Sequence, residues 1–322
     1  MNIRLRVTHP IVLLLVAAGC GKDKASDGSA NTSATTAASA TPVAKSLSEA
    51  RRGFATKPGG MQPPSEPIPQ PPQDIFKLVK YSSPVGELSA YLTPDPGDGQ
   101  KHPAIVWITG GDCNSIGEIW EPAPPENDQT AAVYRKAGIV MMFPSLRGGN
   151  DNPGRREGFL GEVDDVLAAA ESLAAISYVD PARIYLGGHS TGGTLAMLVA
   201  ETSDRFRAVF AFGPVGDVRG YGGDFVYHQP GDQMETKLRS PGYWLDSVRS
   251  PLFVIEGTGG NIDSLRQMQS TCTNSQVRFV AVSGVDHFAI LAPANAAIAA
   301  EIVADTGPTM GINLSEQKLN RR

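Results

Sequence analysis

The sequence predicts one large α/β domain, in which helices cover both faces of a mostly parallel sheet. Two observations carry this prediction. Runs rich in branched and aromatic residues alternate with longer amphipathic runs, and strands that alternate with helices specify a parallel sheet. Several of the short runs are apolar throughout and end in glycine, as strands buried on both faces do. The predicted domain spans residues 74–306.

The strands are predicted in order from residue 75. IFKLVKYSS and GELSAYLTP flank the turn residues Pro84, Val85 and Gly86, and they predict an antiparallel pair because a tight turn joins them. The apolar, β-branched runs that follow are expected to form the buried parallel strands. They occupy residues 102–111, 138–149, 183–188, 207–214, 251–257 and 277–284.

The helices are predicted between these strands. In the run at residues 160–176 the apolar positions form one stripe, as in an amphipathic helix. Its members are Val163, Val166, Leu167, Ala170, Leu173 and Ala174. Further helices are expected at residues 128–137, 194–202, 264–270 and 293–303. Residues 217–247 interrupt the alternation with a segment rich in glycine, tyrosine and charge, which predicts a cap or lid insertion.

The first twenty residues have the features of an export signal. Arg4 and Arg6 precede a short apolar run at residues 11–18, which is too short to span a bilayer. Small residues then precede Cys20, as in the lipobox of bacterial lipoproteins, although Ala17 stands where such boxes usually carry leucine. We expect residues 1–20 to be a lipoprotein-type signal peptide and Cys20 to be acylated. The protein would then be lipid-anchored in the cell envelope, facing the periplasm or the exterior; the alternative is a plain secretory signal or a short anchor.

The flanks of the predicted domain have biased compositions. Residues 21–73 are rich in serine, threonine, alanine and proline. Such a stretch buries too little apolar surface to offset its ordering entropy, so we expect a disordered tether whose last ten residues or so can pack on the domain. Residues 307–322 are expected to be a flexible C-terminal tail.

The composition excludes several classes of function. The formal net charge is −5 and no dense basic block occurs, which argues against nucleic-acid binding. Histidine and cysteine are too sparse for a zinc site, and no glycine-rich phosphate loop is present, so we expect neither a metal nor a cofactor. The topology places Cys113 and Cys272 at opposite edges of the sheet, so no disulfide is expected between them. The oligomeric state is left open.

The stretch RIYLGGHSTGGTLAMLVAE contains the strongest functional signal. Gly188-His189-Ser190-Thr191-Gly192 fits G-x-S-x-G, after a predicted strand and before a predicted helix, which is the context of a nucleophile elbow. Glycines on both sides let the strand and the helix approach closely. Ser190 is therefore the candidate nucleophile, held at a helix N-terminus whose amides and dipole favour a developing oxyanion.

His287 is the candidate base for this serine. It follows the last predicted strand in the segment SGVDHFAIL, at the same edge of the sheet as the elbow. It also follows Ser190 in the order nucleophile, acid, histidine that α/β-hydrolases use. The other histidines lie in the signal, before a buried strand, beside the nucleophile or in the insertion.

The run RGGNDNPGRREGFLGEVDDVLAAAESLAAISYVDPARIYLGGHSTGG resembles the catalytic domain of the prolyl oligopeptidase family and its dienelactone-hydrolase-like relatives. The likeness rests on its Arg-Gly, Asp-Asp-Val, Val-Asp-Pro-Ala-Arg-Ile and Gly-His-Ser-Thr-Gly-Gly elements, and GVDHF resembles the family's histidine loop. The resemblance covers roughly residues 103–304. It implies an α/β-hydrolase fold, with Ser190 as nucleophile and His287 as general base.

The acid of the triad is where the sequence departs from the family. In relatives, an aspartate follows the strand-ending glycine by three residues, whereas here Gly260 occupies that position. Asp263 is the nearest carboxylate beyond it and is our first candidate, although it is equally well placed as a helix N-cap. Glu256, at the end of the strand, and Asp217, after the preceding strand, are the alternatives.

The oxyanion hole needs two backbone donors. The Thr191 N–H is the first, because it follows the nucleophile directly. ITGGDCN stands where relatives have His-Gly-Gly, so the N–H of Gly111 or Asp112 is the second candidate. Cys113 then lies at the edge of the site, but no base adjoins it in sequence.

These residues predict a serine hydrolase that cleaves an ester or amide bond of a small ester or peptide substrate through an acyl-enzyme. An esterase is slightly favoured over a peptidase, since aromatic residues of the insertion can line an acyl pocket. They are Tyr221, Phe225, Tyr227, Tyr243 and Trp244. The alternative is a catalytically weak protein of the same fold that binds a ligand or partner, and the missing acid motivates it.

Overall fold

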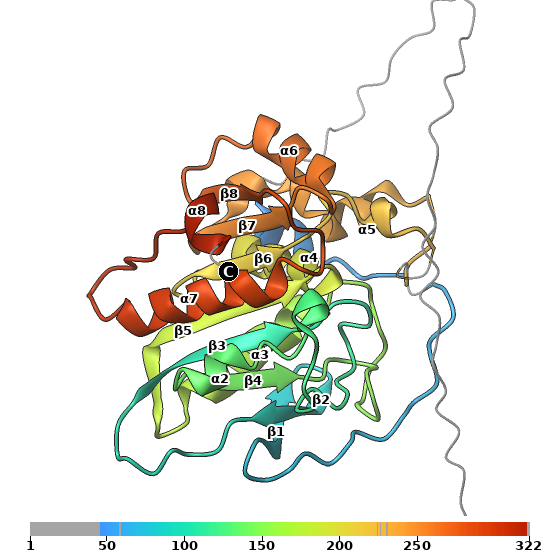
Figure 1. The fold of residues 1–322 in the computed structure, drawn as a ribbon. Coiled ribbons are helices and arrows are strands. Elements are labelled where there is room, and N and C mark those ends of the chain that lie inside the picture. Colours follow the sequence, from blue (N-terminus) through green and yellow to red (C-terminus); the bar gives the residue numbers. More distant parts are fainter. Residues whose placement is uncertain (1–45, 58, 224, 226, 230, 321–322) are drawn as a thin grey trace, which may run out of the picture. The chain divides into compact units, whose positions relative to one another are not determined.

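A computed structural model describes residues 46–57, 59–223, 225, 227–229 and 231–320. The predicted signal peptide, Cys20 and the first part of the predicted tether lie outside these residues. At the centre of the described chain is an eight-stranded sheet in the order β1-β2-β4-β3-β5-β6-β7-β8 (Figure 1). Its strands are β1 (Lys77–Ser83), β2 (Gly86–Leu92), β3 (His102–Ile108), β4 (Val140–Pro144), β5 (Val179–His189), β6 (Val209–Phe212), β7 (Leu252–Gly257) and β8 (Val277–Val282).

The pairing of the strands matches the predicted fold class. β1 pairs with β2 antiparallel, and β2 pairs with β4 antiparallel. Every other pair, from β3 with β4 to β7 with β8, is parallel. The mostly parallel α/β sheet is therefore confirmed. Because the parallel strands run the same way, the loops that follow β3, β5, β6, β7 and β8 all leave from one edge.

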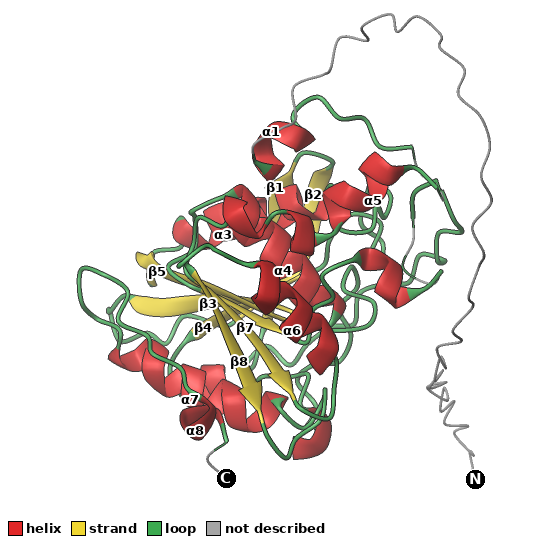
Figure 2. Cartoon of the chain, turned by 90° about the horizontal axis from the view of Figure 1, so that it is seen from above, coloured by secondary structure: helices red, strands yellow, loops and turns green. Residues whose placement is uncertain are grey.

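Helices cover both faces of the sheet (Figure 2). One face carries α3 (Glu162–Ala174), α4 (Thr191–Thr202) and α6 (Ile262–Thr271), and the other carries α2 (Val133–Lys136), α7 (Leu291–Ala304) and α8 (Glu316–Leu319). Strand residues alternate between the two cores, as the period of two requires. Val106 of β3 joins the core under α3 and α4, and its neighbour Trp107 joins the core under α2 and α7.

The first predicted helix is shorter than expected. Of residues 128–137, only Val133–Lys136 are α-helical, and Pro125–Asn127 form a 3-10 turn. The side chain of Asp128 accepts from the Thr130 N–H at 3.1 Å, and the hydroxyl of Thr130 accepts from the Ala132 N–H at 3.2 Å. Such short side chains compete with the helix for its backbone donors, which explains the late start.

The prediction of a disordered tether is wrong for residues 46–57, whereas packing of its last ten residues or so was left open. Ser46 caps α1 (Leu47–Arg51), and Leu47 is fully buried. Arg51 Nη2 lies 2.6 Å from Asp164 Oδ1, and the Lys57 N–H donates to Glu235 Oε1 at 2.6 Å. Composition underestimates the order of this segment, because a few buried side chains are enough to hold it against a surface that the rest of the chain forms.

The prediction of a flexible C-terminal tail is also wrong for the described residues. The side chains of Ile312 and Leu319 are buried against the core under α7. Lys318 Nζ lies 2.5 Å from Glu301 Oε1, and the Ser283 N–H donates to Glu316 at 3.0 Å. α8 therefore packs beside α7 and β8.

The predicted insertion at residues 217–247 lies between β6 and β7. It contains α5 (Gln233–Arg239) and the 3-10 turns η2 (Val218–Tyr221), η3 (Pro241–Tyr243) and η4 (Leu245–Ser247). Arg239 anchors it to the rest of the chain, because its Nε donates to the backbone oxygen of Glu157 at 2.7 Å. Within α5, Arg239 Nη1 and Glu235 Oε2 lie 2.5 Å apart, and neither side chain is exposed by more than 1%. Among the described residues, no helix has the length and apolar character needed to cross a bilayer.

Candidate active site

Ser190 occupies the corner between β5 and α4. Its backbone has φ 54° and ψ −113°, which is a strained conformation for a residue with a side chain. The corner is also crowded. A Cβ atom on Gly192 would lie 2.4 Å from the backbone oxygen of Ile108 in β3, so the glycine is required by close packing. The glycines of the pattern G-x-S-x-G are thus required by the close packing of β5, α4 and β3 around Ser190.

The two predicted oxyanion donors lie side by side. The Thr191 hydroxyl donates to the backbone oxygen of Gly111 at 2.9 Å, which fixes the loop after β3 against the start of α4. Within the described chain, neither the Thr191 N–H nor the Gly111 N–H has a hydrogen-bond partner. The next residue, Asp112, is held by Arg156, whose Nη2 lies 2.9 Å from Asp112 Oδ2. Two amides are therefore free to bind a developing negative charge.

His287 is paired with Glu256 at the end of β7. His287 Nδ1 lies 2.9 Å from Glu256 Oε2, and the Glu256 side chain is only 1% exposed. The N–H groups of Gly257 and Asn261 also donate to this carboxylate, at 2.7 Å and 3.1 Å. Donors on both oxygens hold the carboxylate in place, and the pairing leaves Nε2 of His287 free to exchange a proton.

The first candidate for the acid, Asp263, is wrong. Its side chain is 99% exposed, and its ion-pair partner is Arg266 at 3.9 Å. It is not the N-cap of α6 either, because Asn261 occupies that position. The third candidate, Asp217, is bound to Arg219 instead. The second candidate, Glu256, is the carboxylate that reaches the imidazole.

Gly260 explains why the acid is displaced from its position in the family. A Cβ atom on Gly260 would lie 2.6 Å from Glu256 Oε1 and 2.9 Å from the Cα atom of His287. The longer side chain of a glutamate on the strand therefore occupies the space that an aspartate on the loop would need. Gly260 leaves room for the Glu256 side chain, so a glycine on the loop accompanies a glutamate on the strand.

His189, next to the nucleophile, is part of the site through its ring. The ring is completely buried, and its centroid lies 4.5 Å from that of His287. Burial lowers the pKa of His189 to about 3, so the ring is neutral at pH 7. His189 thus places the His287 ring beside the elbow. In the described residues no hydrogen bond joins Ser190 Oγ to His287, and such bonds often form fully only with substrate bound.

Tyr221 brings the insertion to the nucleophile. Its hydroxyl lies 2.7 Å from Thr194 Oγ1, one helical turn after Ser190, and it makes a polar contact with the Ser190 side chain. Burial raises the pKa of Tyr221, so it keeps its proton at neutral pH. The sequence marked Tyr221 only as one aromatic residue of the insertion, because nothing local shows that it reaches the elbow.

Cys113 does not compete with Ser190 as a nucleophile. Its side chain is buried, and burial raises the pKa of the thiol above its ordinary value. A thiol that stays protonated at neutral pH is a poor nucleophile. Cys113 and Cys272 are both free thiols, and Cys272 lies at the end of α6.

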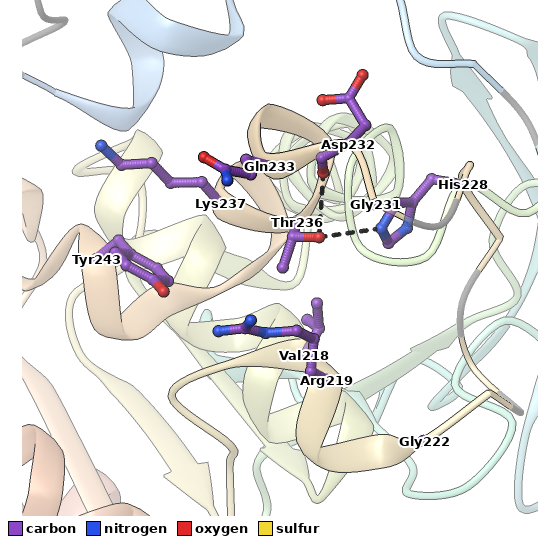
Figure 3. Close-up of a pocket in the computed structure, with 10 residues that line it drawn as sticks. All are labelled: Val218, Arg219, Gly222, His228, Gly231, Asp232, Gln233, Thr236, Lys237 and Tyr243. Atoms are coloured by element: carbon purple, nitrogen blue, oxygen red, sulfur yellow. Dashed lines mark hydrogen bonds between the residues drawn. The ribbon is translucent and has the colours of Figure 1, made fainter. Parts of the chain in front are cut away.

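A cavity of about 780 Å³ opens within the insertion. Figure 3 shows η2 residues Val218 and Arg219 facing the side chains of α5 across it. The remaining lining residues are Gly222, His228, Gly231, Asp232, Gln233, Thr236, Lys237 and Tyr243. The cavity wall carries the positive charges of Arg219 and Lys237 and the aromatic ring of Tyr243. No group of metal-ligating side chains large enough to hold an ion occurs in the part of the chain that the structure describes.

Comparison with known proteins agrees with this geometry. Residues 125–258 match the model of the prolyl oligopeptidase family. The match covers less than half of the chain, so this range is similar to a prolyl oligopeptidase family domain. The matched range contains Ser190 and Glu256 and ends before His287, so only the tertiary structure brings these three residues together.

A curated relative and two solved structures are similar to parts of this chain. The dual-function macrocyclase-peptidase POPB of Galerina marginata is 34% identical over 123 residues, which cover 36% of this chain and 16% of that protein. A puromycin-hydrolyzing peptidase of Mycobacterium tuberculosis superimposes with a TM-score of 0.57 at 20% identity, covering 74% of this chain and 41% of that one. The acylaminoacyl peptidase of Pyrococcus horikoshii gives a TM-score of 0.59 at 17% identity, covering 76% and 44%.

The extent of these matches sets what they show. The chain spans less than half the length of the curated relative and of both solved structures. At these identities the solved structures show a shared fold alone, and the expected α/β-hydrolase fold is confirmed. The family resemblance expected from the sequence is supported by the match of residues 125–258.

Proposed function

We propose that this protein is a serine hydrolase of the peptidase class, with Ser190 as nucleophile, His287 as general base and Glu256 as the acid that orients it. The observation that carries the proposal is the 2.9 Å contact between His287 Nδ1 and Glu256 Oε2, at the sheet edge where β5 turns into α4. A buried carboxylate on Nδ1 fixes the tautomer that leaves Nε2 able to accept a proton.

The reaction follows from these positions. Nε2 of His287 takes the proton of Ser190 as Oγ forms a bond to the substrate carbonyl carbon, and the oxyanion is held by the N–H groups of Thr191 and Gly111. The imidazolium, stabilised by Glu256, returns the proton to the leaving amine or alcohol as the carbonyl–leaving-group bond breaks. Water then attacks the acyl-enzyme, again with His287 as base, and frees Ser190.

The substrate class is drawn from the comparisons. The matched family and the similar solved structures are peptidases by name, which moves the balance from an ester toward an amide substrate. We therefore propose a short peptide or aminoacyl amide as substrate.

A ligand-binding protein without efficient catalysis is the rival function. It was motivated by the lack of an aspartate at position 260. Glu256 Oε2, 2.9 Å from His287 Nδ1, can take the role of that aspartate.

A fluorophosphonate probe tests the hydrolase proposal directly. Ser190 Oγ attacks phosphorus, fluoride leaves, and the proton passes to His287. We expect labelling of the wild-type protein, none in Ser190→Ala and a large loss in His287→Ala, with all three proteins folded by circular dichroism. An unlabelled, folded wild-type protein at neutral pH would favour the rival.

The substrate class has its own measurement. Fluorogenic aminoacyl amides and short peptides are compared with p-nitrophenyl esters by kcat/KM on the same preparation. Esters are intrinsically more reactive, so the comparison is made for each substrate against its own uncatalysed rate. A larger acceleration for amides supports the peptidase, and acceleration of esters alone returns the assignment to an esterase.

We also propose that the mature chain is exported and lipid-anchored at Cys20, with the membrane as its partner through that anchor. The support is the pattern of residues 1–20. Radiolabelled palmitate should be incorporated into the wild-type protein expressed in a bacterium and not into Cys20→Ser. Equal incorporation in both would reject acylation at this residue.

A further inference from the structure

Two side chains link the three segments that form the proposed active site. Gln129 Oε1 accepts from the Gly110 N–H at 3.2 Å, and Gln129 Nε2 lies 2.8 Å from His189 Nδ1. His189 Nε2 in turn lies 2.9 Å from the backbone oxygen of His287. The loop after β3, the residue before the nucleophile and the loop of the general base are thereby joined in one chain of hydrogen bonds.

The donor or acceptor character of each partner determines where the protons lie in this series of hydrogen bonds. A backbone N–H only donates, so Gln129 must turn its Oε1 toward Gly110. Its Nε2 then faces His189 Nδ1 and gives its second hydrogen to Asn127 Oδ1 at 2.9 Å. Because Nε2 donates, Nδ1 of His189 must accept and carries no proton. The His189 proton is therefore on Nε2, where the carbonyl of His287 accepts it.

The charge of His189 matters because of what lies next to it. The titratable groups in contact with the His287 ring are Glu256 from β7 and His189 from β5. Asp286, the preceding residue, is exposed, and its carboxylate accepts from the N–H groups of Phe288 and Ala289. Acyl transfer makes His287 an imidazolium, which Glu256 stabilises. A second positive charge on His189, whose ring centroid is 4.5 Å away, would oppose that step.

We propose that Gln129 is a positioning residue of this site, which holds His189 as the neutral Nε2–H tautomer so that His189 anchors the loop of His287. The role rests on the proposed serine hydrolase function. Two observations support it independently of any activity. His189 is completely buried, so a charge there would lose its hydration. Burial also lowers the pKa of His189 to about 3.

Nitrogen-15 spectra of the histidine rings in the wild-type protein give the first test, with the His189 signals identified by their absence in His189→Asn. We expect a protonated Nε2 and an unprotonated Nδ1 that stay unchanged from about pH 5 to 8. A proton on Nδ1, or titration of His189 in this range, overturns the proposal. This measurement needs no substrate.

Gln129→Glu gives the second test. A carboxylate still accepts from the Gly110 N–H, but it also accepts where the amide donated, so it draws a proton onto His189 Nδ1. We expect a doubly protonated His189 at pH 7, with kcat for a p-nitrophenyl ester lower by roughly tenfold or more and KM changed by less than about twofold. Gln269→Glu, the same exchange at an exposed position on α6, should leave both the spectrum and kcat unchanged.

The outcomes separate this inference from the proposed function. A wild-type kcat in a folded Gln129→Glu variant with protonated His189 overturns the positioning role alone, provided the wild-type protein reacts with the fluorophosphonate. A wild-type protein that does not react removes the proposed function and the role of Gln129 with it. A neutral Nε2–H tautomer, a protonated ring in Gln129→Glu and a reduced kcat together support it.

Discussion

Glu256 Oε2 lies 2.9 Å from Nδ1 of His287. Glu256 is the next-to-last residue of strand β7, so this carboxylate comes from the sheet and not from the loop beyond it. A residue at the end of a buried strand is held more rigidly than one on a loop, because its backbone is paired within the sheet. Here Glu256 pairs across to Ala281 of β8. The carboxylate is thus fixed by the sheet itself.

Glu256→Gln should reduce kcat by about 10³-fold to 10⁴-fold, because an amide cannot stabilise the imidazolium and can favour the wrong tautomer of His287. Asp263→Asn, the same exchange at the exposed carboxylate, should change kcat by less than about twofold. Steady-state kinetics on p-nitrophenyl esters check both variants. The reverse ranking would return the acid to the loop.

Tyr221→Phe should lower kcat by about tenfold with little change in KM, because it removes a hydroxyl beside the nucleophile that is held by Thr194 at 2.7 Å. Tyr243→Phe is the matched control, since its hydroxyl binds Asp217 at 3.3 Å and the residue is half exposed. Equal rates for all three proteins would show that the hydroxyl of Tyr221 has a packing role only.

Ser190→Gly should be more stable than Ser190→Ala by about 1 kcal/mol in free energy of unfolding. Both substitutions remove the hydroxyl, but only glycine adopts φ 54° without strain. The larger freedom of glycine in the unfolded chain offsets part of the gain. Urea titrations of the two variants measure the difference, and an alanine variant that is the more stable one would mean that the corner stores no strain.

The free energy of unfolding should fall as the pH drops from about 6.5 toward 3. The folded-state pKa of His189 is about 3, below the unfolded value of about 6.5, so the unfolded chain binds the extra proton in this window. The loss is up to about 1.4 kcal/mol per pH unit from this group. His189→Gln should flatten the profile measured by urea unfolding, and a profile as steep as that of the wild type would contradict this assignment.

Leu47→Ala should destabilise the protein by about 2–4 kcal/mol. Leu47 belongs to the described N-terminal segment, and its side chain is fully buried against the core. Met61→Ala, at a side chain 90% exposed in the same segment, should change stability by less than about 0.5 kcal/mol. Thermal or urea unfolding compares the two. A neutral Leu47→Ala would mean that the segment does not contribute to the stability of the domain.

Local patterns predicted most of the secondary structure and two members of the site. The strand runs and the helix at 160–176 are visible because their periodicities differ. Ser190 is visible because a crowded corner demands glycine at fixed offsets, as the contact of Gly192 with Ile108 shows. His287 is visible because the strand order alone brings its loop to the edge of the elbow.

The residues that the sequence missed act over distances that no local pattern records. Gln129 lies in a segment predicted as helix, yet its amide joins Gly110 to His189. The described part of the predicted tether is poor in apolar residues, yet Leu47 is buried by surfaces that other segments build. Neither contact has a signature in the residues next to it.

The sequence by itself determined a parallel α/β sheet with a serine at a strained corner and a histidine at the same edge. Only the tertiary structure decided which carboxylate serves that histidine. Glu256 and Asp263 are seven residues apart in sequence, and the direction in which the chain leaves β7 turns one into the buried edge and the other out to solvent. The path of a loop depends on the surfaces that pack against it, and for this loop those surfaces come from β6, β8 and the segment of His287.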